Sequence, residues 1–208
     1  MNAIIKGTFL LLFVLLVGHT LRAQDTRRMY FGFSLEPTWS MLNLEMPHER
    51  GLTRFGVNIN LQSLKYIKQW VGVYFGLSLL NNGGRIRVVD DNSSILADDI
   101  VCRFQYLALP LGIALTTPLK RNVQVNFQLG VAAALNIDGS ITWGNDVGNI
   151  DDVRTFSPFY QGTLSVQYHI GQDVYLHLGP SYIRSMTSIT KNMEIIQQSF
   201  GIRAGIIF

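Results

Sequence analysis

The chain has 208 residues, a formal net charge of +3 and a single cysteine; 48% of its residues are hydrophobic but only 15% are charged. Ordinary globular proteins carry about 25% charged residues, so the composition disfavours an ordinary soluble domain. The length suits one domain. Cys102 stands alone in the sequence, which excludes an internal disulfide and a cysteine-based metal centre.

The first residues have the order of a secretory signal peptide. Lys6 supplies a positive charge, an apolar run covers 9–17, and Ala23 is a small residue at the expected cleavage point. The run is too short for a spanning helix, which needs about 20 residues. We therefore predict a signal peptide over residues 1–23 and one exported domain over residues 24–208.

Cleavage also changes the charge of the protein. Lys6 and Arg22 leave with the peptide, so the formal charge falls from +3 to +1. A nucleic-acid partner is therefore not expected, because such a partner is recognised by a strongly basic surface.

Eight segments of the remaining chain alternate strictly between apolar and small or polar residues. They cover 31–40, 54–62, 71–79, 106–115, 123–137, 160–170, 173–182 and 199–208. A period of two places the two residue sets on opposite faces of a β-strand. Soluble strands usually have about 5–6 residues, whereas a tilted strand needs about 9–11 to cross a bilayer. The length of the segments favours membrane-spanning strands.

The composition of each face predicts which one meets lipid. One face is aliphatic and aromatic, and the other consists mainly of Gly, Ala, Ser, Asn and Gln, which suits a narrow polar interior. Lipid offers no water to backbone groups, so the sheet must close on itself. The predicted fold is all-β, an eight-stranded antiparallel transmembrane barrel of the outer-membrane type. A soluble barrel with the apolar face inward is the alternative, and it would need more surface charge.

The connectors between these segments alternate in length. Short ones are expected near 65–68, 116–121 and 171–172, and long ones over about 41–53, 81–100, 138–157 and 184–194. This pattern is typical of periplasmic turns and extracellular loops, with both termini in the periplasm. Aromatic residues at the strand ends are expected to form interfacial girdles: Tyr30, Trp39, Trp70, Tyr160, Tyr182 and Phe208.

Three segments resemble the PorT-like outer-membrane β-barrel family of the Bacteroidetes group. They are the cleavage region 21–24, the mid-barrel segment 106–112 (YLALPLG) and the closing strand 200–208 (FGIRAGIIF). The resemblance implies a barrel in the bacterial outer membrane, and one branch of that family serves type IX protein secretion and gliding. The terminal Phe208, with apolar residues at every second position before it, resembles the signal read by the barrel-assembly machinery.

Few ionisable residues are expected inside the barrel. Glu36 and Arg203 belong to the first and last strands at similar height, and they form either an internal ion pair, which we favour, or a lumen gate. His169 and His177 are also expected to face inward, with Asp173 close in sequence. They would need a further ligand or nucleophile to form a metal or acid–base site, so hydrogen-bonded lumen histidines are favoured.

The long loops carry the acidic pairs Asp90–Asp91, Asp98–Asp99 and Asp151–Asp152, together with His48. We interpret the pairs as solvated charges or weak divalent-cation sites that bridge to lipopolysaccharide; catalysis by loop carboxylates with His48 is the alternative. An eight-stranded barrel leaves room only for side chains, and several are expected to fill it: Tyr74, Tyr106, Gln124 and Gln128.

The sequence thus predicts a monomeric outer-membrane barrel without catalytic activity, cofactor or metal, acting as a structural or interaction component. An accessory role in protein secretion is one hypothesis; a small barrel enzyme and a narrow channel are the alternatives. The expected partners are outer-membrane lipid and lipopolysaccharide, the barrel-assembly machinery and components of a secretion system.

Overall fold

The computed structural model describes most of the predicted domain. The described residues are 29–44, 49–68, 70–88, 100–120, 122–143, 146–149, 152–171, 173–192 and 194–208. The predicted signal peptide, His48 and the acidic pairs of the loops, apart from Asp152, lie outside these ranges. Within them, no helix is long and apolar enough to cross a membrane.

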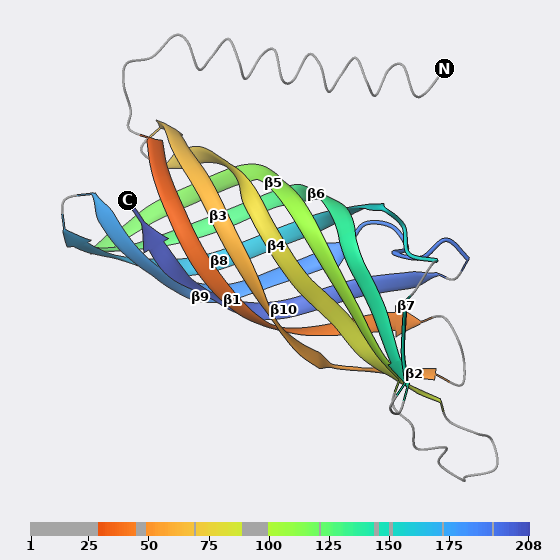
Figure 1. Cartoon of the computed structure of the whole chain (residues 1–208). Coiled ribbons are helices and arrows are strands. Elements are labelled where there is room, and N and C mark those ends of the chain that lie inside the picture. Colours follow the sequence, from red (N-terminus) through yellow and green to blue (C-terminus); the bar gives the residue numbers. More distant parts are fainter. Residues whose placement is uncertain are drawn as a thin grey trace, which may run out of the picture.

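The described part of the chain forms ten antiparallel strands (Figure 1). They are β1 (Met29–Leu44), β2 (Glu49–Leu52), β3 (Arg54–Lys68), β4 (Val71–Val88), β5 (Ile100–Lys120), β6 (Val123–Trp143), β7 (Asp146–Asn149), β8 (Phe156–Gly171), β9 (Val174–Ser185) and β10 (Ile195–Ile207). Eight of them close a barrel in the order β1-β3-β4-β5-β6-β8-β9-β10, and β10 pairs back with β1. The eight-stranded barrel is confirmed, and β2 and β7 extend it by pairing with β4 and β6.

The alternation of the sequence sorts the side chains as predicted. Outward-facing aliphatic and aromatic residues are exposed on every barrel strand, up to 61% for Leu119. The intervening residues, such as Ser34 and Asn60, are buried in the interior. A continuous apolar exterior around a polar interior is the reverse of a soluble barrel, and it requires lipid around the molecule.

The two ends of the barrel differ. The start of β1, the end of β10 and the β8–β9 turn lie at one end, whereas β2 and β7 lie at the other (Figure 1). Termini and tight turns mark the periplasmic end of an outer-membrane barrel, and long connections mark the extracellular end. The tight turn includes Asp173, whose φ of 63° lies in the left-handed region that Asp tolerates.

The strands are longer than the sequence predicts. β4 has 18 residues and β5 and β6 have 21 each, so residues 81–88 of one predicted connector and residues 138–143 of another are strand. Their outward residues are polar here, which hides the strands from an apolar pattern. A bulge contributes as well, because Gln105 pairs with Asp138 while Tyr106 pairs with Asn136. The extra residue reverses the alternation of β6 beyond Ile137.

One of the expected girdle residues faces inward. Tyr30 packs in the interior near the periplasmic end, where its ring contacts Tyr66 and Tyr175 at centroid distances of 5.9 and 6.1 Å. Its even number places it on the inner face of β1 with Gly32 and Ser34, so the prediction for Tyr30 was wrong. Trp39, Trp70, Tyr160 and Phe208 are exposed as expected, and Tyr182 packs partly on Phe200.

Three prolines interrupt the strand pairing inside the barrel wall. Pairing of β1 with β10 skips from Leu35–Ala204 to Thr38–Gly201, across Pro37. Pairing of β4 with β5 has the same gap at Pro110, and that of β8 with β9 at Pro180. Proline has no N–H to donate and leaves a gap in a sheet ladder.

The interior has three layers. Near the periplasmic end Leu64, Tyr74 and Ala114 form a small apolar cluster. Polar side chains fill the middle of the barrel. Toward the extracellular end a larger apolar cluster forms, and its members include Leu42, Leu80, Phe104, Tyr106, Phe159, Ile183 and Ile195. The predicted small and polar interior therefore holds for the middle of the barrel, and the extracellular half is more apolar than the sequence indicated.

Candidate functional site

The polar middle layer is built around Glu36 and Arg203 on the two strands that close the barrel. Both side chains are buried, with exposed fractions of 1% and 4%. Arg203 Nε donates to Glu36 Oε2 over 2.7 Å. The structure therefore brings these two predicted interior residues into an ion pair, which lies beside the gap that Pro37 leaves between β1 and β10.

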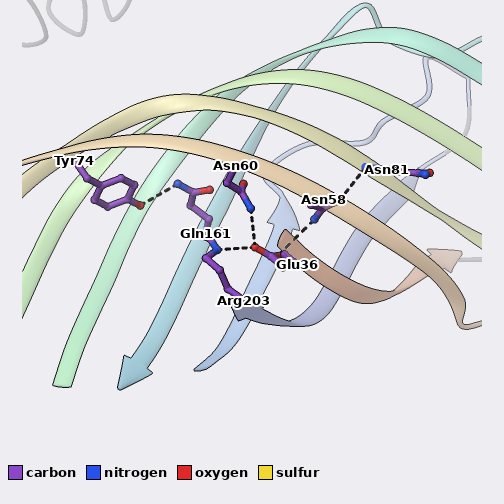
Figure 2. Close-up of polar contacts among 7 residues, drawn as sticks. All are labelled: Glu36, Asn58, Asn60, Tyr74, Asn81, Gln161 and Arg203. Carbon is purple, nitrogen blue, oxygen red and sulfur yellow. Dashed lines mark hydrogen bonds and ion pairs between the residues drawn. The ribbon is translucent and has the colours of Figure 1, made fainter. Parts of the chain in front are cut away.

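Two amides of β3 complete the surroundings of the carboxylate (Figure 2). Asn60 Nδ2 donates to Glu36 Oε2 over 3.3 Å, and Asn58 Nδ2 lies 3.5 Å from Oε1. Asn58 Oδ1 in turn accepts the backbone N–H of Asn81 over 2.9 Å. Buried charge is tolerated where it is paired and its remaining lone pairs are hydrogen-bonded, and both conditions hold for Glu36.

Two further hydrogen bonds reach across the interior. Gln161 Nε2 of β8 donates to Tyr74 Oη of β4 over 2.9 Å (Figure 2). Ser199 Oγ of β10 donates to Asn82 Oδ1 of β4 over 3.3 Å. β4 is separated from β8 and from β10 by two intervening strands on either side. Side chains therefore bridge the lumen at two heights.

Close backbone approach allows the Tyr74 ring to lie flat inside the wall. It lies over Gly112 and Gly130, which face each other on β5 and β6. A Cβ atom on Gly112 would come within 2.7 Å of the Tyr74 ring, and one on Gly130 within 2.5 Å of its hydroxyl. The two glycines thus make room for the tyrosine that bridges to Gln161.

The extracellular end of the lumen is closed by β1. Leu42 points inward and packs against Gly84 of β4, where a Cβ would come within 2.7 Å of the leucine side chain. Ser40 Oγ accepts the N–H of Gly83, which ties the same two strands together. Tyr106 and Phe159 stack edge to face at 5.3 Å just below.

The two interior histidines occupy different surroundings. His177 is buried next to Gly205, where a Cβ would meet its Nε2 at 2.6 Å. His169 is half-buried nearer the periplasmic turn, with its ring 4.8 Å from that of Tyr175. No group of three His, Cys, Asp or Glu side chains that could hold a metal occurs among the residues that the structure describes.

The remaining predicted sites are peripheral. Phe208 is 59% exposed on the lipid face, and its backbone exchanges two hydrogen bonds with Phe31, which completes the β1–β10 seam. Its part in assembly stays a prediction. Asp152 accepts the backbone N–H of Asn192 through Oδ2 over 3.1 Å, so this loop carboxylate orders a neighbouring connector.

Sequence reasoning missed three members of the polar layer. Asn58, Asn60 and Gln161 were counted only as part of a polar face. The available signal was positional, because Asn58 lies opposite Glu36 on the neighbouring strand and the next inward residue is Asn60. The predicted fillers Tyr74, Tyr106 and Gln128 are buried, and Gln124 donates to Gln167 over 2.7 Å.

Fold and interior together define an outer-membrane β-barrel with a filled lumen. The chain belongs to the family of the outer membrane protein β-barrel domain, whose model matches residues 22–194. The protein is therefore located in the bacterial outer membrane. Membership of the PorT branch is a finer assignment than this match provides.

Solved structures of the same fold are distant in sequence. OprG from Pseudomonas aeruginosa is 11% identical, with a TM-score of 0.52 over 86% of this chain and 94% of OprG. Neisserial surface protein A is also 11% identical, with a TM-score of 0.51 over 85% of this chain and 95% of that protein. At this identity the likeness shows the fold alone. No curated protein matches the sequence significantly.

Proposed function

We propose that this protein is a non-conducting, non-catalytic barrel that presents an ordered extracellular extension to a partner. The observation that carries the proposal is the pair of hydrogen bonds that cross the lumen, Tyr74–Gln161 and Asn82–Ser199. Side chains that join strands across the lumen obstruct the path that a solute would take. A function must then lie on the outer surface.

The extracellular end offers such a surface. β4, β5 and β6 continue beyond the apolar belt and carry β2 and β7 at their edges. Nearby, Val153 bridges to Thr190, and Arg154 Nε donates to Thr190 O over 2.9 Å. These contacts join the connector before β8 to the connector after β9. The extension is therefore an ordered structure that can present side chains in fixed positions.

The polar layer favours a structural role over catalysis. A general base or nucleophile must have a free lone pair directed at a substrate. Both oxygens of Glu36 already accept from Arg203 or the β3 amides, and the layer lies below the apolar cluster that closes the extracellular end. The Glu36 carboxylate is thus engaged in holding the seam.

A finer form of the proposal is an accessory role in protein secretion. It is supported by the resemblance of the segments 21–24, 106–112 and 200–208 to the PorT-like branch. Deleting the gene should then retain secreted cargo in the periplasm, and a plasmid copy should restore export. Normal export in the deletion strain would remove the secretion role and leave the broader proposal in place.

Site-specific photo-crosslinking in living cells tests the broader proposal. A photoreactive residue would replace Gly148 or Thr155, which are exposed on the extension, and Leu109, which faces lipid, would serve as the control. We expect discrete protein adducts from the extension positions and none from Leu109. Equal, adduct-free patterns at all three positions would contradict the proposal.

A further inference from the structure

A basic surface lies directly above the apolar belt on β4 and β5. The last outward-facing apolar pair is Leu79–Leu107, and the next outward pair is Asn81–Gln105. Beyond it Gly83 faces Arg103, and Arg85 follows on β4. Two residues advance a strand by about 6.8 Å. Arg103 comes four residues from Leu107, so it lies about 14 Å along the strand above the last aliphatic pair. This is the height at which lipid acyl chains give way to headgroups.

A third arginine, Arg54, reaches β4 near this level through Asn81 and Asn82. Arg85 and Arg103 are exposed, and both repel Arg54 at the start of β3 electrostatically. Arg54 Nη1 donates to Asn81 Oδ1 over 3.3 Å and to the backbone O of Asn82 over 3.0 Å. Both acceptors are neutral, so these contacts orient the guanidinium without cancelling its charge.

The cluster keeps its positive charge within the described structure. No ion pair joins Arg54, Arg85 or Arg103 to a carboxylate among the described residues; the described ion pair is Arg203–Glu36. Gly83 lies opposite Arg103 at a φ of 156°, and a Cβ there would meet Cys102 O at 2.1 Å. A side chain is therefore excluded at position 83, so the residue of β4 opposite Arg103 adds no side chain to this surface.

We propose that Arg54, Arg85 and Arg103 form a binding site for the phosphate groups of lipopolysaccharide in the outer leaflet. Arginine presents a planar set of donors that matches phosphate oxygens, and the contact is charge-assisted. The acyl chains of the same molecule would lie along Leu79 and Leu107 directly below. This continuity favours a membrane glycolipid over a soluble anion.

A nearby carboxylate offers a second way to bind phosphate, through a divalent cation. Asp138 of β6 pairs with Gln105 and is exposed one step from the level of Arg103. A divalent cation held by Asp138 offers a second way to retain a phosphate. Direct arginine contact should survive EDTA, whereas cation bridging should not.

The test measures binding of purified phosphorylated lipid A to the folded barrel in detergent micelles that contain EDTA. The variant R85Q/R103Q removes two positive charges from the site. R184Q/K191Q is the matched control, because Arg184 and Lys191 are exposed elsewhere at the extracellular end. Heat-modifiable migration on a denaturing gel verifies that each variant is folded.

We expect the dissociation constant of R85Q/R103Q to rise at least tenfold and that of R184Q/K191Q to change less than twofold. Wild-type binding should weaken when phosphorylated lipid A is replaced by its dephosphorylated form, or when salt is raised to screen the charges. Equal affinity of both double variants, or of both lipids, would overturn the proposal. Loss of wild-type binding in EDTA would also overturn it, because the lipid phosphate would then be bound through a divalent cation at Asp138. Preference for a soluble sulfated glycan over lipid A would overturn it as well.

Discussion

Glu36 and Arg203 form a charge pair in a part of the barrel that water reaches poorly. Desolvation of two ions is costly, and it is offset here by a short charge-assisted bond and by the amides of Asn58 and Asn60. The pair lies where Pro37 weakens the backbone ladder of the closing seam. A side-chain ion pair therefore joins β1 and β10 at the point where backbone hydrogen bonds between them are missing.

Removing both partners should destabilise the barrel less than the two single removals added together. Glu36→Ala leaves the Arg203 charge buried without its partner and should cost about 3 kcal/mol, as should Arg203→Ala. The double variant should cost less than the sum, with a coupling of about 1–3 kcal/mol. Denaturant unfolding of the four proteins in lipid vesicles, followed by tryptophan fluorescence, measures the cycle. Additive losses would show that the pair contributes no mutual stabilisation.

The contact between these residues was predictable, whereas their surroundings were not. Strand parity places Glu36 and Arg203 inside, and closure makes their strands neighbours, so two general rules suffice. The inward position of Tyr30 follows from the same parity, although its place at a strand end suggested a girdle. The bridge from Gln161 to Tyr74 depends on which strands face each other across the lumen, and no local pattern contains that information.

At the scale of the strand, Pro37 leaves a backbone acceptor without its donor. Phe31, six positions earlier on β1, exchanges both of its backbone hydrogen bonds with Phe208. The backbone of residue 37 therefore also faces β10, toward Ile202. Pro37→Ala should add the missing N–H and close the gap in the seam.

Hydrogen exchange measures that closure. One restored hydrogen bond contributes about 1 kcal/mol, so the Ile202 amide should exchange about fivefold more slowly in Pro37→Ala. The amide of Ile206 provides an internal control, because its pair with Phe33 is already formed. Unchanged exchange at Ile202 would mean that the seam cannot close even when the donor is present.

The facing glycines of β5 and β6 make a second prediction at this scale. A Cβ on Gly112 would come within 2.3 Å of Leu129 O and 2.7 Å of the Tyr74 ring, whereas one on Gly171 would meet nothing within 4 Å. Gly112→Ala should therefore cost about 1–3 kcal/mol through overpacking. Gly171→Ala, with unhindered space, should stay within about 1 kcal/mol of the wild type. Equal unfolding midpoints in vesicles would contradict this reading of the wall.

The extracellular strand extensions show where sequence patterning stops. Below Leu79 and Leu107 the solvent of the outer face is lipid, and apolar alternation reveals the strand. Above that pair the outer face meets water. Polar residues such as Asn81 and Arg103 face this water while their backbones remain paired in the sheet. Hydrogen bonding to neighbours then defines the element, and a bulge opposite Gln105 and Tyr106 breaks what remains of the alternation.

For the whole molecule, we expect closure of the lumen to be redundant. An eight-stranded barrel encloses a space just wide enough for side chains, and here three groups of side chains reach into it: the Glu36 ion pair, the Tyr74–Gln161 bridge and the extracellular cluster around Phe104. Loss of one group should leave the other two in place. The barrel should then conduct no ions across the membrane, even when one of these groups is removed.

Planar-bilayer recordings test this redundancy. The purified wild type should show no steady conductance, and neither should Gln161→Ala, because that change removes a bridge but leaves the extracellular cluster intact. Removing that cluster as well, with Phe104→Ala and Phe159→Ala added, should produce discrete conductance steps while heat-modifiable migration shows that the barrel persists. Steady conductance of the wild type would favour the narrow-channel alternative over a surface function. Silence of the triple variant would instead mean that the Glu36 ion pair and the remaining members of the cluster, with Leu42 packed on Gly84, seal the lumen without the two phenylalanine rings.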